Sequence, residues 1–376
     1  MQKVLFVATV VKTHIMEFHL PYLQMFKEQG WETAVAARND YENPADCVVP
    51  GCDSYFDIPF ERNPLKWGNF RAYRQLKMII DNGEYDIIHC HTPVGAMLTR
   101  LAARKARKRK TRVIYTAHGF HFYKGAPLLN RFIYYPVEKW LSRYTDTLIT
   151  INREDYAAAQ KFHAKEVRYV HGVGVDTRKF GAAIDRGKKR AELGLQENDF
   201  ALLSVGELIS RKNHEVVVRA LGELKKSGHL EHTVYLICGR GVLEKKLESL
   251  VQELGLSGAV RFLGYRNDIS EICTACDLFA FMSRQEGLPV ALVEAMACGL
   301  PCICSEIRGN TDLIRNGENG CIVPSTPQGV ANAIMELRGQ VEVRTRLSGQ
   351  ARTEAEKYDI RTVEQEMYGI YFLSPT

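Results

Sequence analysis

Two glutamates, Glu286 and Glu294, lie in the segment QEGLPVALVEAMACGLP with seven residues between them. The apolar run Val290–Cys298 predicts a buried helix, and Pro289 suits its first turn. A carboxylate inside such a helix is costly unless it is paired or hydrogen-bonded. Gly287 and the free N–H groups of the first turn offer donors to an anion. The segment therefore indicates a site for a phosphate or a sugar, whose hydroxyl pairs donate to the carboxylates; a structural pairing of Glu294 is the alternative.

Adjacent Arg211 and Lys212 lie in the loop GELISRKN, which begins at Gly206 directly after the predicted strand Ala201–Val205. An arginine can donate to two oxygens at once, whereas a lysine acts as a point charge. Together they can hold a diphosphate. The P-loop pattern GxxxxGK[ST] is absent from this loop, and a solvated loop is the alternative reading.

Two more loops follow predicted strands. One begins at Gly239, and the other contains Gly264, Tyr265 and Arg266. Glycine lets a backbone approach a ligand closely, and ligands of open α/β sheets bind beyond the carboxyl ends of the strands. These loops are therefore candidates for the same site as Arg211 and Lys212.

The first half of the chain is rich in histidine. Six histidines lie between residues 14 and 121: His14, His19, His89, His91, His118 and His121. Zinc is conceivable, but the spacing lacks the HExxH pattern and shows no third ligand nearby, so hydrogen bonding to a sugar or phosphate is favoured. No Asp-x-Asp occurs in the chain, which argues against a divalent metal at a diphosphate. Positive charge must then come from side chains and helix dipoles.

The elements that must position these residues alternate between short apolar strands and helices, in two series. This pattern predicts an α/β protein of two doubly wound, Rossmann-like domains facing each other across a cleft. The expected boundaries are 1–180, joined by a C-terminal helix at about 361–376, and 181–360. The predicted helices include Glu17–Gln29, Ala96–Lys110 and Thr362–Phe372. The predicted strands are Val4–Thr9, Thr33–Ala37, Asp86–His89, Val113–Thr116, Thr147–Ile151, Arg168–Val170, Ala201–Val205, Val234–Cys238, Val260–Phe262, Leu278–Met282, Cys302–Cys304 and Cys321–Val323.

Charge and composition narrow the location and the partners. The 376 residues carry a formal net charge of +6, and the ten cysteines read as reduced thiols. The N-terminal apolar stretch is too short for a signal peptide, so we expect a cytoplasmic protein. Eight cations fall between Arg100 and Arg112 with no acidic residue among them. We interpret Arg104–Arg112 as a contact with an anionic membrane surface, against a solvated helix end as the alternative; nucleic acid is disfavoured because aromatic residues do not interleave.

The Glu286–Glu294 segment resembles the EX7E motif of retaining GT-B glycosyltransferases of family 4, and the resemblance extends over the whole chain. VGELISRKN is similar to that family's diphosphate clamp, ICGRG and FLGYRNDI to its nucleotide-binding loops, and NGENGCIVP to its terminal strand signature. HCHTPVGAMLTRLAAR, YTAHGFHFYKGAP and YTDTLITINREDY resemble a narrower subset from bacterial capsule, exopolysaccharide and lipid-linked oligosaccharide gene clusters.

The resemblance assigns roles to residues of this chain. It implies that Glu286 and the backbone of Gly287 and Leu288, before Pro289, hold the donor sugar. Glu294 would bind the ribose hydroxyls. Arg211 and Lys212 would bind the diphosphate, with Glu207 standing where many relatives have arginine. The implied catalytic residues are His118, Glu286, Arg211 and Lys212; the implied donor-binding residues add Gly206, Gly239, Gly264, Tyr265, Arg266, Gly287, Leu288, Pro289 and Glu294; the acceptor side takes His14, His91 and His121.

The implied activity is metal-independent, retaining transfer of a hexosyl or N-acetylhexosaminyl group from a nucleoside-diphosphate sugar, expected to be UDP-linked. The acceptor would be a glycan or a polyprenyl-diphosphate-linked hydroxyl, with the enzyme peripheral at the inner face of a bacterial membrane and no cofactor. A UDP-sugar 2-epimerase of the same architecture and a non-catalytic nucleotide-sugar-binding subunit are the alternatives. An oxidoreductase is disfavoured, because no GxGxxG follows the first strand.

Overall fold

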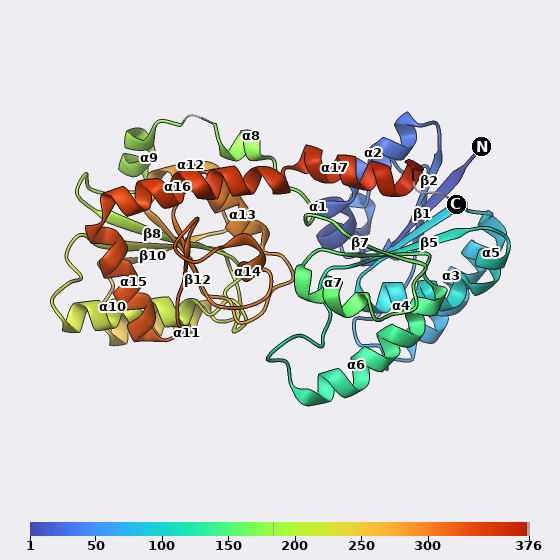
Figure 1. The fold of residues 1–376 in the computed structure, drawn as a ribbon, viewed down its shortest axis with the longest axis horizontal. Coiled ribbons are helices and arrows are strands. Elements are labelled where there is room, and N and C mark those ends of the chain that lie inside the picture. Colours follow the sequence, from blue (N-terminus) through green and yellow to red (C-terminus); the bar gives the residue numbers. More distant parts are fainter. Residues whose placement is uncertain (183, 374–376) are drawn as a thin grey trace. The chain divides into compact units, whose positions relative to one another are not determined.

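The computed structural model describes residues 1–182 and 184–373 and divides the chain into two compact units, each built on one parallel sheet (Figure 1). Unit 1 comprises Met1–Val173 and the segment from Val363 onward, and unit 2 comprises Gly174–Thr362. The boundaries predicted from the sequence were at residues 180 and 360. Residues 374–376 of the expected C-terminal helix lie outside the described residues.

The sheet of unit 1 has strand order β3-β2-β1-β4-β5-β6-β7. Its central strand is buried on both faces, with Leu5 and Val7 on one face and Val4 and Phe6 on the other. This explains why central strands read as continuous apolar runs. β3 was not predicted, because it is a short edge strand that is only partly buried. The strands are β1 Lys3–Val10, β2 Glu32–Arg38, β3 Ser54–Asp57, β4 Ile87–His91, β5 Arg112–Ala117, β6 Thr147–Thr150 and β7 Glu166–Tyr169.

Helices cover both faces of this sheet (Figure 1). α3 and α4 pack on the face of Leu5 and Val7, while α2 and α17 pack on the other. The predicted inner face of the last helix is confirmed, since Val363, Met367, Ile370 and Tyr371 are all buried. The helical segments are η1 Val11–Ile15, α1 Met16–Phe18, α2 Leu20–Glu28, η2 Pro44–Asp46, α3 Gly68–Gly83, α4 Pro93–Ala102, α5 Arg104–Lys108, α6 Leu128–Leu141, η3 Ser142–Tyr144, α7 Arg153–Ala159, α17 Ile360–Tyr368 and η5 Gly369–Leu373.

Two predicted helices of unit 1 are interrupted. The predicted helix Glu17–Gln29 is broken at His19, and Pro21 lies in the first turn of the helix that follows. Proline is tolerated there because its missing N–H would have no partner within the helix. The predicted helix Ala96–Lys110 is likewise divided at Ala103.

Unit 2 has the sheet order β10-β9-β8-β11-β12-β13. α10, α11 and α15 cover one face, and α12 and α13 cover the other. The strands are β8 Phe200–Val205, β9 Thr233–Cys238, β10 Val260–Gly264, β11 Leu278–Phe281, β12 Cys302–Cys304 and β13 Cys321–Ile322. The helical segments are α8 Thr177–Phe180, α9 Arg186–Glu192, α10 His214–Lys226, α11 Glu244–Glu253, α12 Ile269–Ala275, α13 Val290–Ala297, α14 Asn310–Leu313, α15 Pro327–Gly339, α16 Val341–Ala355 and η4 Glu356–Tyr358.

Both sheets reverse their strand order at one point, between β1 and β4 in unit 1 and between β8 and β11 in unit 2. Ligands of doubly wound sheets bind beyond the carboxyl ends of the strands at such a switch point. The loops that leave β8 and β11 carry Arg211, Lys212 and Glu286, while His14 lies in the helical turn that follows β1 and His91 is the last residue of β4. The topology therefore brings most of the predicted site residues to the two switch points.

Candidate functional site

In unit 2, the loop after β8 and the loop after β11 lie side by side. The backbone N–H of Arg284 donates to the carbonyl oxygen of Arg211 at 2.8 Å. β8 and β11 are hydrogen-bonded neighbours in the sheet, so their carboxyl ends hold the two loops at the same edge. Two segments that are about seventy residues apart in sequence therefore form one surface.

Glu286 is the centre of an ion cluster in this surface. Its Oε2 accepts from Nη1 of Arg211 at 2.9 Å, and its Oε1 accepts from Nζ of Lys212 at 2.8 Å. The Glu286 side chain is only 8% exposed, so the two cations offset the cost of burying its charge. The Arg308 Nε also donates to the Glu286 carbonyl oxygen at 3.0 Å. The cluster fixes two positive groups side by side at the loop surface.

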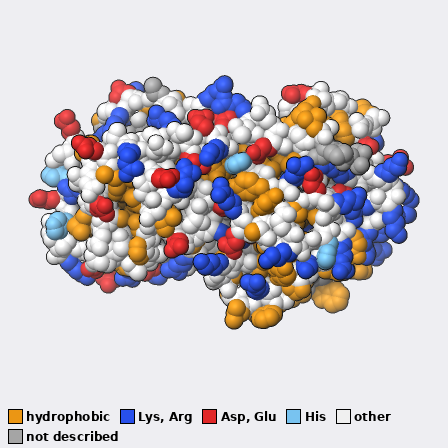
Figure 2. Space-filling model, viewed as in Figure 1, with side chains coloured by type: hydrophobic (Ala, Val, Ile, Leu, Met, Phe, Trp, Pro, Cys, Tyr) orange, Lys and Arg blue, Asp and Glu red, His pale blue; other side chains and the backbone are white. Residues whose placement is uncertain are grey.

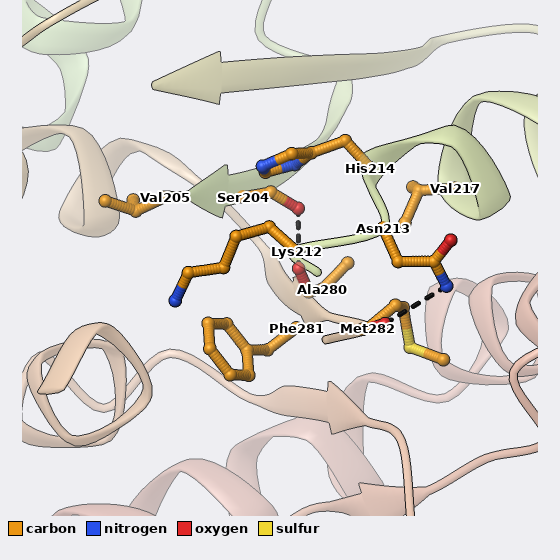
Figure 3. Close-up of a pocket in the computed structure, with 9 residues that line it drawn as sticks. All are labelled: Ser204, Val205, Lys212, Asn213, His214, Val217, Ala280, Phe281 and Met282. Atoms are coloured by element: carbon orange, nitrogen blue, oxygen red, sulfur yellow. Dashed lines mark hydrogen bonds between the residues drawn. The ribbon is translucent and has the colours of Figure 1, made fainter. Parts of the chain in front are cut away.

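Neighbouring residues that the sequence did not single out position Lys212. Figure 3 shows the Lys212 side chain extended alongside Phe281, with Nζ 5.0 Å from the ring centroid. Asn213 adopts a left-handed backbone conformation with φ of 55°, and its Nδ2 donates to the Met282 carbonyl oxygen at 3.2 Å. Burial lowers the pKa of the adjacent His214 to about 4, so this imidazole is neutral. Asparagine tolerates the left-handed region, which is the sequence signal that could have identified Asn213.

Glu294 lies on α13, as predicted. Burial raises the pKa of its carboxyl to about 7, against a smaller opposing effect of Lys179. Among the described residues, no hydrogen bond or ion pair engages this carboxylate, so the structural pairing considered from the sequence finds no partner. No side chain caps the start of α13 either. The helix thus offers unpaired N–H donors at its first turn and one carboxylate poised to accept.

The three predicted glycine loops come together, but they pack against one another. A Cβ on Gly239 would lie 2.0 Å from the carbonyl oxygen of Gly206, and the Gly239 N–H donates to the Gly264 carbonyl oxygen at 2.7 Å. The close approach that glycine permits is therefore between loops of the chain itself. Tyr265 is exposed. Arg266 is already engaged, because its Nε donates to Oδ1 of Asp268 at 2.7 Å.

In unit 1, four histidines gather at the switch point. One ring nitrogen from each of His14, His19, His91 and His118 lies within 4.8 Å of the others. The sequence argument that no third ligand lies nearby is wrong, because the helical turns after β1 bring His14 and His19 to His91, at the end of β4, and to His118, just after β5. His121 does not join them; its ring lies 4.8 Å from that of Tyr134. His19 was named among the histidines of the first half, but the sequence assigned it no specific role at the site.

The cluster consists of neutral imidazoles. Burial lowers the pKa of His118 to about 4 and lowers the pKa values of His14, His19 and His91 well below the ordinary value. Several of their buried ring nitrogens have no partner among the described residues, including both of His19. By contrast, His89 is fully satisfied by Tyr371 and Thr116. Hydroxyl groups or a transition-metal ion could engage these nitrogens.

Only part of the basic segment Arg104–Arg112 is exposed to solvent. Arg107 forms a bidentate pair with Asp146, and Arg112 donates to the Tyr371 carbonyl oxygen at 3.2 Å. Arg100, the first of the eight cations, is fully buried against Glu138. The exposed cations are Arg104, Lys105, Lys108, Arg109 and Lys110. In the described part of the chain, no helix combines the length and apolarity needed to cross a membrane.

Comparisons with known proteins agree with this fold. The model of the family "Glycosyl transferases group 1" matches residues 185–354, and that of "Glycosyl transferase 4-like" matches residues 3–152. The putative glycosyltransferase EpsD of Bacillus subtilis is 42% identical over 98% of this chain and 96% of its own length. An Escherichia coli UDP-Gal:alpha-D-GlcNAc-diphosphoundecaprenol alpha-1,3-galactosyltransferase is 33% identical over 68% of this chain and 66% of its own length.

Solved structures share the whole architecture. Anabaena HepE in complex with UDP superposes with a TM-score of 0.80 at 21% identity, over 98% of this chain and 99% of that one. WaaG, a glycosyltransferase of lipopolysaccharide biosynthesis, gives a TM-score of 0.75 at 20% identity, over 99% and 100% of the two chains. The fold is therefore GT-B, and the class is a glycosyltransferase. The chain belongs to the family 4-type, group 1 glycosyltransferases, which confirms the resemblance seen in its sequence.

Proposed function

We propose that this protein is a retaining glycosyltransferase that moves a hexosyl or N-acetylhexosaminyl group from a UDP-sugar to a lipid-linked glycan in bacterial surface polysaccharide synthesis. The observation that carries this proposal is the unpaired Glu294 carboxylate on α13, in the same unit as the Glu286–Arg211–Lys212 cluster. A carboxylate can bind the ribose hydroxyls and two cations the diphosphate. UDP and a diphosphoundecaprenol acceptor are supported by the E. coli relative, and UDP also by the HepE complex.

The proposed chemistry follows from where charge develops. As the glycosyl bond breaks, negative charge grows on the leaving diphosphate, and preorganised cations and helix N–H groups stabilise it without reorganising. Arg211, Lys212 and the start of α13 supply these groups. Glu286 binds the donor sugar and keeps the two cations in place. In unit 1, His14, His91 and His118 offer neutral ring nitrogens to sugar hydroxyls, with His118 at the reacting sugar.

The test is UDP release from UDP-GlcNAc, UDP-GalNAc, UDP-glucose and UDP-galactose, each with and without a polyprenyl-diphosphate-linked acceptor. We expect one donor to be preferred and the acceptor to accelerate release. Proton NMR of the fresh product should show the same anomeric configuration as the donor. A UDP-sugar 2-epimerase would instead convert the donor without any acceptor, and a non-catalytic binding subunit would bind UDP without turnover.

We further propose that transfer needs no divalent metal at the diphosphate, because side chains and a helix start provide the positive charge. UDP release in the complete assay is expected to continue at the same rate in EDTA. Loss of activity on chelation and recovery with Mn²⁺ or Mg²⁺ would contradict the role of Arg211 and Lys212. Recovery with Zn²⁺ alone would instead identify the histidine cluster as a metal site.

A membrane-linked acceptor requires the enzyme to work at a membrane surface. We propose that it is a peripheral protein of the inner face of the bacterial membrane, attracted by the exposed cations among Arg104–Arg112. Each cation near an anionic surface contributes about 1 kcal/mol, and the effect decays within roughly a Debye length. The internal pairing of Arg107 and Arg112 reduces the number of cations available, so attraction by charge alone is weaker than the sequence suggested.

A further inference from the structure

On α6, most apolar side chains face solvent, whereas an ordinary surface helix turns them towards the core. Its inward side includes Glu138, which forms a bidentate pair with the fully buried Arg100 at 2.9 and 3.2 Å. Tyr135 also faces inward, with its ring 5.4 Å from that of Phe162 and 5.2 Å from that of Phe122. Of its fourteen residues, only Leu141 is buried. An ion pair and the Tyr135 ring therefore hold the helix, and most of its apolar residues are left on the outward side.

The outward side of α6 is a continuous apolar surface, here called the α6 face. Phe132 is 75% exposed and Leu128 is 74% exposed. Figure 2 shows hydrophobic side chains gathered where α6 lies in Figure 1, with cations beside them. Soluble proteins rarely expose a contiguous apolar surface of this kind unless it binds something. The α6 face consists of Leu128, Leu129, Phe132, Ile133, Val137 and Trp140.

A basic groove adjoins the C-terminal end of this helix. The Trp140 ring lies 5.6 Å from that of Tyr144, which in turn lies 5.6 Å from the Arg104 guanidinium. Arg104 and Tyr144 line a groove of about 700 Å³, together with Lys105, Lys108, Arg143 and Lys165. None of the described residues that line this groove is acidic. Trp140 therefore lies where the α6 face meets the basic groove.

We infer that the α6 face inserts into the interfacial layer of an anionic membrane while the basic groove binds the headgroup phosphates of its lipids. An interfacial helix buries an apolar face at the acyl boundary and surrounds it with cations, and tryptophan and tyrosine favour the headgroup level. The inference rests on the proposed function in one respect: the membrane contact would serve to bring unit 1 to a lipid-linked acceptor. A second copy of the chain fits less well, because two such basic grooves would be brought close together and repel.

The test measures binding of the full-length protein to vesicles of phosphatidylcholine alone or mixed with phosphatidylglycerol. We expect binding only to the mixed vesicles, weakening as NaCl rises from about 0.05 M to about 0.5 M. The double variant Leu128→Ser/Phe132→Ser should bind at least about tenfold more weakly. Its matched control is Val242→Ser/Val341→Ser, which removes two exposed apolar side chains from unit 2 and should bind normally.

The charge component has its own pair of variants. Lys105→Gln/Lys108→Gln is expected to lose binding several-fold and to show a shallower salt dependence. Lys188→Gln/Lys245→Gln, an equal change of charge in unit 2, should have little effect. In a Trp67→Phe background, Trp140 is the exposed tryptophan that remains, and brominated lipid should quench its fluorescence.

Distinct outcomes separate this inference from the proposed function. If it is correct, Leu128→Ser/Phe132→Ser keeps wild-type UDP affinity but loses transfer to a membrane-embedded acceptor, and it recovers transfer to a short-chain, water-soluble acceptor. Equal vesicle binding by this variant and its control would overturn the inference. So would a dimer that is detected by sedimentation of the wild type and lost in the variant. Failure to bind UDP would count against the proposed function alone.

Discussion

Replacing Lys212 by methionine is expected to reduce the rate of glycosyl transfer by about a hundredfold to a thousandfold, the effect of removing one preorganised group that stabilises developing charge. The side chain is 14% exposed and its Nζ lies 2.8 Å from Oε1 of Glu286. Its position is therefore fixed before any donor binds. Methionine keeps most of the aliphatic length beside Phe281 and removes only the charge, so the defect should appear in kcat more than in the KM for the donor.

A matched set of variants isolates this effect. Lys212→Arg keeps the charge but changes its geometry, and it should recover only part of the rate, since a guanidinium is not a point charge. Lys245→Met, on the exposed side of α11, controls for loss of a surface cation and should have wild-type kinetics. Thermal unfolding of all three shows whether Glu286 has lost the support of its partners. A folded Lys212→Met variant with normal kcat would remove Lys212 from the catalytic machinery.

The fold was predictable because strands that are buried on both faces of a sheet appear in the sequence as continuous apolar runs. Strands such as Phe200–Val205 and Thr233–Cys238 lie between two helical layers, so nearly every residue must be apolar. Edge strands carry a weaker signal, and Ser54–Asp57 was missed for that reason. Helix interruptions at His19 and Ala103 were also missed, because the apolar period continues on either side of each break.

The site was predictable where its residues are close in sequence or follow a strand. Arg211, Lys212 and Glu286 meet because β8 and β11 are neighbours, which the general rule for doubly wound sheets anticipates. His19 was missed because its approach to His91 depends on tertiary packing. The exposed α6 face was missed for a related reason. The side of Leu128–Leu141 that faces in is shown by tertiary contacts, of Glu138 with Arg100 and of Tyr135 with Phe122 and Phe162.

The Glu294→Gln variant is expected to bind UDP about tenfold to hundredfold more weakly, because an amide replaces one hydroxyl-accepting oxygen and removes the charge from the bond. Titration calorimetry with UDP measures this directly. Glutamine is nearly isosteric, so the packing of α13 should be preserved. Unchanged affinity in a folded variant would contradict the assignment of Glu294 to the nucleotide.

The affinity of the wild type for UDP should also depend on pH, and the ionisation of Glu294 determines whether it rises or falls. Its carboxyl has a pKa of about 7 in the free protein. Hydroxyl donors stabilise the charged form, so bound UDP lowers this pKa and binding releases a proton. Affinity should therefore rise by about tenfold from pH 6 to pH 8 and level off above that. The UDP phosphate titrates in the same range, with a pKa of about 6, so the residual pH dependence of Glu294→Gln measures that contribution.

The same raised pKa predicts the stability of the free protein. The folded state holds the Glu294 proton up to about pH 7, whereas the unfolded state releases it near 4.5. The folded state thus binds more protons across this window, and the free energy of unfolding falls as pH rises through it. Glu294→Gln has no proton to lose and should flatten this part of the profile, becoming more stable than the wild type above about pH 7 while binding UDP less well. Opposite changes in stability and affinity from one substitution are expected of a carboxylate that is buried for binding. A variant that lost both would show that Glu294 supports the fold.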